Sequence, residues 1–98
     1  MTDEQKEMLA DITKKYRLLS GMTLEAFGEY LCGELLGARQ QRQNIFNWEK
    51  GVQPVPRYFA MMVWLAYNKK VDLRASWALE CLKVIDAQAW EGVSEVSE

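Results

Sequence analysis

The stretch 41–51 constrains the fold of this chain most strongly, because its apolar residues recur with the period of a helix that then stops abruptly. Ile45 and Trp48 lie three residues apart and therefore share one face of a helix. Gly51 suits the left-handed residue that ends a helix, and two prolines shortly after it prevent the helix from resuming. We expect a short helix over about 41–50 that buries this face.

The opposite face of the same helix is rich in amides and cations rather than in the Glu and Lys of a plain surface helix. It carries Gln43, Asn47 and Lys50, flanked by Arg42, Asn44 and Phe46. Amide and cationic side chains are the groups that reach base edges and phosphates in a DNA groove. We interpret this face as a surface for nucleic acid.

Helical spacing of apolar residues recurs along the rest of the chain, and no segment shows the strict alternation of a strand. We therefore expect an all-α fold with five helices. Gly33 and Gly37 weaken a continuous second helix, which we expect to end near Gly37, with a loop as the alternative. The helices are expected over about 2–20, 23–37, 41–50, 56–67 and 72–90, with Thr2, Thr23 and Asp72 as N-caps and Pro56 as the first residue of the fourth.

A length of 98 residues allows one domain with a single core. We assign it to residues 1–91, followed by a short polar tail over 92–98. No apolar run approaches the roughly 20 residues that span a bilayer, and the N-terminus is too acidic for a signal peptide. We expect a cytoplasmic protein without membrane contact, in which Cys32 and Cys81 are reduced thiols in or near the core.

The formal net charge is −2, which taken alone argues against a nucleic acid partner. Cations nevertheless predominate between residues 38 and 74, while acids gather near the two ends. Those cations are Arg39, Arg42, Lys50, Arg57, Lys69, Lys70 and Arg74, against Glu49 and Asp72. This segregation is consistent with one cationic face for phosphates, although we read Lys69, Lys70 and Arg74 as ordinary helix-end charges.

The sequence offers little for catalysis. It contains no His for acid–base work, no Gly-rich phosphate loop and no carboxylate cluster at the spacing of metal ligands. We therefore expect neither an enzyme nor a metal or cofactor site.

Three segments together resemble the lambda-repressor-like (Xre/Cro) helix-turn-helix family of DNA-binding proteins. Residues 17–23 resemble the end of the family's first helix and the capped start of its second. Residues 43–51, which end in Trp-Glu-x-Gly, are similar to the third helix, and residues 56–66 resemble the fourth. The resemblance implies a five-helix domain whose recognition helix enters the major groove of double-stranded DNA. It also implies a transcription regulator, such as a repressor, of bacterial or phage type that acts as a homodimer.

The same resemblance implies roles for individual residues. Base contacts would come from Arg42, Gln43, Asn44 and Asn47, and phosphate contacts from Arg39, Lys50 and Arg57. Arg17 and Glu49 would form a structural ion pair between the first helix and the third. The dimer surface is expected on the apolar fourth helix and the Trp-bearing fifth.

Three departures from the family pattern favour an alternative. Thr23 is separated from Trp48 by about seven residues more than is common, close to two helical turns, so either the second helix or the turn is extended. Leu24 replaces a phosphate-binding Gln, and Phe46 places an apolar ring on the presumed DNA face. The alternative is a protein-interaction module, adaptor or antitoxin-like, that keeps the helix-turn-helix fold without specific DNA binding. Its partner would bind through Phe46 or the fourth and fifth helices.

Overall fold

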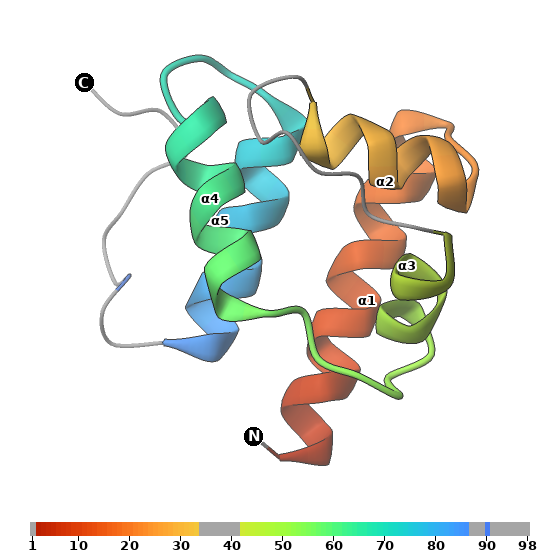
Figure 1. Ribbon diagram of the computed structural model, residues 1–98. Helices are drawn as coiled ribbons and strands as arrows, with labels where there is room; N and C mark the ends of the chain where they lie inside the picture. Colours follow the sequence, from red (N-terminus) through yellow and green to blue (C-terminus); the bar gives the residue numbers. More distant parts are fainter. Residues whose placement is uncertain (1, 34–41, 87–89, 91–98) are drawn as a thin grey trace.

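A computed structural model of the chain describes residues 2–33, 42–86 and 90, and all regular structure among them is helical (Figure 1). The helices are α1 Asp3–Ser20, α2 Leu24–Cys32, α3 Arg42–Glu49, α4 Arg57–Tyr67 and α5 Leu73–Ile85. The predicted all-α class is thus confirmed for this part of the chain. Helix α1 packs against α3 and α5, α4 lies along α5, and α2 contacts α3. None of these helices combines the length and apolar character needed to cross a membrane.

Helix α3 ends as the sequence predicts, at a glycine in the left-handed conformation. Gly51 has φ 72°, which glycine adopts without the steric cost that a Cβ would add. Its N–H donates to the Trp48 carbonyl at 3.2 Å, and the Val52 N–H donates to the Asn47 carbonyl at 3.0 Å. These two bonds form a Schellman motif, and they turn the chain away from the axis of α3 towards α4.

Helix α2 is shorter than expected, because it ends at Cys32 rather than near Gly37. Gly33 follows with φ +57°, and a Cβ at this position would lie 1.9 Å from the Tyr67 hydroxyl oxygen. That hydroxyl donates to the Cys32 carbonyl at 3.3 Å. The extended second helix is therefore wrong, and the lengthened connection over 34–41, which includes Arg39, lies outside the described residues.

Two other helix boundaries differ from expectation. Pro56 is the N-cap of α4 rather than its first residue: it has ψ 134°, and its carbonyl accepts the Ala60 N–H at 3.1 Å. Helix α5 ends at Ile85 rather than Trp90, because Asp86 leaves the helical conformation with ψ 60°. Trp90 lies beyond this end, where its ring meets the Trp64 ring edge-on with centroids 5.9 Å apart.

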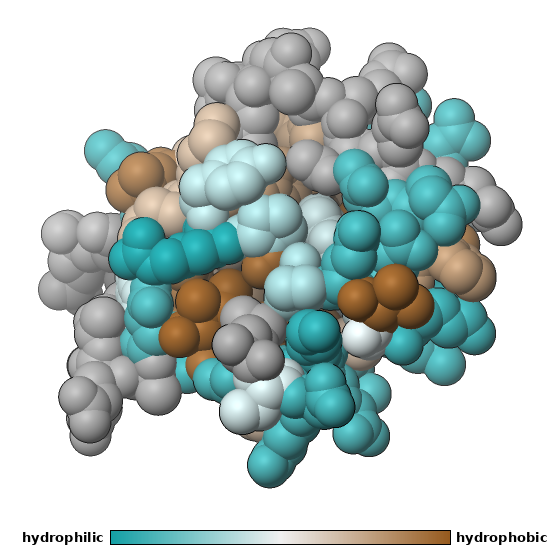
Figure 2. All heavy atoms as spheres, turned by 60° about the horizontal axis from the view of Figure 1, so that its bottom comes forward, coloured by the Kyte–Doolittle hydropathy of each residue, from teal (hydrophilic) through white to brown (hydrophobic). Residues whose placement is uncertain are grey.

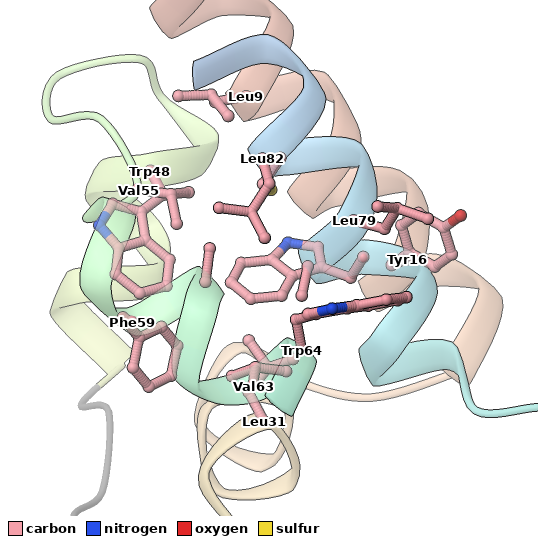
Figure 3. Close-up of a cluster of buried hydrophobic side chains, with 14 of the residues drawn as sticks. Leu9, Tyr16, Leu31, Trp48, Val55, Phe59, Val63, Trp64, Leu79 and Leu82 are labelled. Carbon is pink, nitrogen blue, oxygen red and sulfur yellow. The ribbon is translucent and has the colours of Figure 1, made fainter. Parts of the chain in front are cut away.

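The core is centred on aromatic rings from three helices. The rings of Trp48 and Trp77 stack with centroids 6.2 Å apart, and Phe59 meets the Trp77 ring edge-on at 6.0 Å. Trp48 and Phe59 lie side by side on α3 and α4 (Figure 3). Trp77 is fully buried, so this ring of the fifth helix belongs to the core. Cys32 and Cys81 are both buried and neither forms a disulfide, as predicted.

One buried hydrogen bond fixes the central indole. Thr13 Oγ1 accepts from Trp77 Nε1 at 3.1 Å and donates to the Leu9 carbonyl at 2.9 Å. We expect Thr13→Val to lower the free energy of unfolding by about 1–3 kcal/mol, because a buried indole N–H loses its acceptor. Urea denaturation measures this loss. Ser20→Ala, which removes a half-buried hydroxyl from the same helix, should change it by no more than about 0.5 kcal/mol. Equal effects of the two variants would contradict this account.

Candidate nucleic-acid interface

Burial of one side of α3 directs the other side outward. Ile45 is fully buried and Trp48 is 3% exposed, which orients the short helix relative to α1 and α2. The opposite side, here called the α3 outer face, comprises Gln43, Asn44, Phe46, Asn47 and Lys50, of which only Asn47 is half-buried. Seen from the end at which α1 begins, the surface of the molecule is mainly hydrophilic with separate apolar patches (Figure 2).

Two amides of the α3 outer face are joined to each other. Gln43 Nε2 donates to Asn47 Oδ1 at 3.0 Å, the pairing expected for residues four apart on an exposed helix face. The bond uses a donor of Gln43 and an acceptor of Asn47. It leaves the Gln43 oxygen as an acceptor and the Asn47 amide N–H groups as donors. A donor and an acceptor side by side match the edge that adenine presents in the major groove.

Lys50 and Phe46 form the other half of this face. The Lys50 Nζ lies 5.5 Å from the centroid of the Phe46 ring, within the range of a cation–π interaction. Phe46 is 36% exposed. The pair therefore places a cation, suited to a phosphate, next to an apolar ring, suited to a thymine methyl group or to an apolar side chain of a protein.

The ion pair expected between Arg17 and Glu49 is present and holds α3 against α1. Arg17 Nε and Nη2 donate to the two carboxylate oxygens at 2.6 and 3.0 Å, and Nη1 donates to the Met22 carbonyl at 3.3 Å. The side chains are 18% and 9% exposed. The hydrogen bonds that the Arg17 guanidinium donates to Glu49 raise the pKa of Arg17. One arginine thus ties together the end of α1, the turn into α2 and the end of α3.

The other predicted contact residues are placed differently. Arg42 is the first residue of α3, and Arg39 lies outside the described residues. Arg57 is exposed at the start of α4 and is ion-paired with Asp86, the C-cap of α5. A phosphate at Arg57 would have to replace that carboxylate. Nothing in the local sequence signals this pair, because its partners lie on different helices.

Acidic side chains of α1 approach Lys50, which sequence reasoning missed. Asp3, Glu7 and Asp11 recur every fourth residue and line a hollow of about 330 Å³ together with Glu49 and Lys50. Their negative charge opposes an anion on this side of Lys50, so a phosphate could approach Lys50 only from its other side.

Comparisons of the chain with models of protein families, with curated proteins and with solved structures find no match. Function is therefore inferred from the α3 outer face and from the contacts that hold it. The described geometry brings Gln43, Asn47, Phe46 and Lys50 together on one exposed helix side.

Proposed function

We propose that the chain is a sequence-specific regulator of transcription of bacterial or phage type. In this proposal α2 and α3 form a lambda-repressor-like helix-turn-helix, and α3 enters the major groove of double-stranded DNA. The observation that carries the proposal is the α3 outer face, an exposed, amide-rich helix side whose opposite side is anchored by Ile45 and Trp48. The bidentate Arg17–Glu49 pair supports it, because it fixes α3 to the rest of the domain.

Bases and phosphates would be contacted by different parts of the surface. Gln43 and Asn47, with Asn44 and Arg42 beside them, would meet base edges. Lys50, Arg57 and Arg39 would meet phosphates, which position the protein without reading sequence. At Arg57 the exposed N-terminus of α4 would assist, with a phosphate replacing Asp86.

A homodimer fits an exposed apolar stripe on α4. Tyr58, Met62 and Leu65 are spaced four and three residues apart, so they share one helix side, and they are 67%, 41% and 63% exposed. We propose this stripe as the dimer surface, because contiguous exposed apolar side chains mark interaction sites. Two recognition helices would then address half-sites about one DNA turn, roughly 34 Å, apart.

Lys50→Ala is expected to weaken binding to every duplex and to reduce the slope of log K against log salt by about 0.9, the contribution of one phosphate contact. Fluorescence anisotropy with a labelled duplex between low and moderate salt measures the slope. Lys83→Ala, which removes an exposed cation from α5, is the matched control and should leave the slope unchanged. Binding that is independent of salt in the wild type would refute the proposal.

A second candidate is the protein-interaction module, adaptor or antitoxin-like. It is favoured by the exposed Phe46 ring within the α3 outer face and by the acids of α1 beside Lys50. The test is isolation of a stoichiometric protein partner from cell extract treated with nuclease. Loss of that partner in Phe46→Ala, together with no binding to any duplex at low salt, would favour this candidate over the DNA-binding regulator.

A further inference from the structure

The turn between α4 and α5 lies at a distance from α3 (Figure 1). A second hollow lies at this turn. It has a volume of about 300 Å³, and its walls include Leu65, Tyr67, Lys69, Lys70, Asp72 and Arg74. Three of these side chains are cationic and one is anionic. Because the molecule as a whole carries a net charge of −2, this excess of positive charge is a local property of the turn.

Some charged side chains of the turn are ion-paired and others are not. Asp72 is bonded to Arg74, with Oδ1 at 3.0 Å from Nε and Oδ2 at 2.8 Å from Nη2. Lys69 and Lys70 are exposed and form no ion pair with the rest of the described chain. Among the described residues, the one carboxylate that lines the hollow is therefore already bonded to Arg74, and two ammonium groups are left to attract an anion.

Arg74 is held in a fixed position at the wall of the hollow. Its guanidinium lies 3.6 Å from the centroid of the Tyr67 ring and 4.5 Å from that of the Tyr30 ring. Its Nη1 donates to the Tyr30 carbonyl at 3.3 Å. The hydrogen bond with Asp72 raises the pKa of Arg74, and the bond with Arg74 lowers the pKa of Asp72. A planar cation fixed between two rings is preorganised for an oxyanion.

The same turn contains an unused polar group. Asn68, the C-cap of α4, is 8% exposed, and its side-chain oxygen is buried without a hydrogen-bond partner in the described part of the chain. Buried polar atoms without partners are rare in folded proteins. Asn68 does not line the hollow, and its free atom is an acceptor, so it would bond to a donor such as water and does not contribute to binding an anion.

We propose that the α4–α5 hollow binds a small molecule through a compact oxyanion, either a phosphate or a carboxylate group. Lys69 and Lys70 would neutralise the anion, and the fixed guanidinium of Arg74 would form one side of the site. The ring of Tyr67 would contact the rest of the ligand.

The hollow is connected to the end of α2. Arg74 donates to the Tyr30 carbonyl, and Tyr67 donates to the Cys32 carbonyl at 3.3 Å. An anion bound beside the fixed Arg74 and Tyr67 would therefore adjoin the contacts that hold the last turn of α2, from which the chain continues towards α3. In the DNA-binding regulator this ligand would act as an effector. That consequence rests on the proposed function, whereas binding itself does not.

The test is titration of the ¹⁵N-labelled full chain with sodium phosphate, and separately with citrate, at constant ionic strength. We expect saturable amide shifts confined to residues 65–74 and to Tyr30, Cys32 and Gly33, with half-saturation on the order of 1 mM for a few charge-assisted contacts. Of the phosphate and citrate titrations, the one that saturates at the lower concentration identifies the type of anion that the hollow prefers. The double variant Lys69→Gln/Lys70→Gln should bind about tenfold more weakly.

The matched control is Lys14→Gln/Lys83→Gln, which removes two exposed lysines from α1 and α5 and should bind as the wild type does. Shifts that fail to saturate, or that spread over all lysines, would mean an adventitious ion only and would overturn the proposal. Binding by Lys69→Gln/Lys70→Gln that equals the wild type would also overturn it. A duplex that shifts the same resonances would assign the turn to DNA instead. No step of the phosphate titration uses DNA. The titration therefore still tests anion binding if the chain proves not to bind DNA.

Discussion

Glu49→Ala is expected to lower the free energy of unfolding by about 3 kcal/mol. The substitution leaves the Arg17 guanidinium, which is 18% exposed, without the carboxylate that accepts two of its hydrogen bonds. Removing one partner of a buried pair typically costs about 3–5 kcal/mol, and the residual exposure of Arg17 places this case at the lower end. Urea denaturation followed by far-UV circular dichroism measures the change.

The chain supplies a matched control for this prediction. Lys15 and Glu80 also link two helices by an ion pair, at 2.9 Å, but their side chains are 50% and 35% exposed. Glu80→Ala should therefore cost about 1 kcal/mol or less. Arg17→Met/Glu49→Leu, which removes both charges, should recover part of the loss. If Glu49→Ala were no more harmful than Glu80→Ala, the pair would not hold α3 in place.

Gln43→Ala and Asn47→Ala are each expected to reduce the preference for a specific site over unrelated DNA by about tenfold to a hundredfold. Each amide would supply a base contact, and a good bidentate contact is worth about 1–3 kcal/mol of discrimination. Because the two amides are hydrogen-bonded to each other at 3.0 Å, the double variant should lose less than the sum of the two single effects. Competition between a duplex that carries the specific site and a scrambled duplex, at one salt concentration, measures the ratio of the two affinities.

Lys50→Ala serves as the contrasting variant in that experiment. It should weaken both duplexes equally, since a phosphate contact carries no sequence information. If Gln43→Ala/Asn47→Ala still prefers the specific duplex over the scrambled one, the α3 outer face does not recognise bases.

Much of the local structure follows from residues close together in the chain. The caps at Thr2, Thr23 and Asp72 and the left-handed Gly51 are present as predicted. Burial of Ile45 and Trp48 follows from their spacing within one short helix. Each of these features depends on hydrogen bonds or periodicity within a few residues, which sequence patterns report directly.

Features that depend on distant residues were not predictable in the same way. At the end of α2, the Tyr67 hydroxyl from α4 occupies the space that a Cβ at Gly33 would take. The pairing of Arg57 with Asp86 and the approach of the α1 acids to Lys50 depend on how helices pack. The Arg17–Glu49 pair is the exception. It joins residues far apart in the chain, and it was predicted from the resemblance to the helix-turn-helix family.

Selection of bound duplexes from a random pool at moderate salt will decide whether the outward side of α3 reads DNA sequence. We expect enrichment of an inverted repeat with half-site centres about one helical turn, roughly 34 Å, apart. We also expect Gln43→Ala/Asn47→Ala to abolish the enrichment while the variant remains folded. Recovery of no preferred sequence by the folded wild-type chain, at any salt concentration that permits binding, would contradict this role of α3.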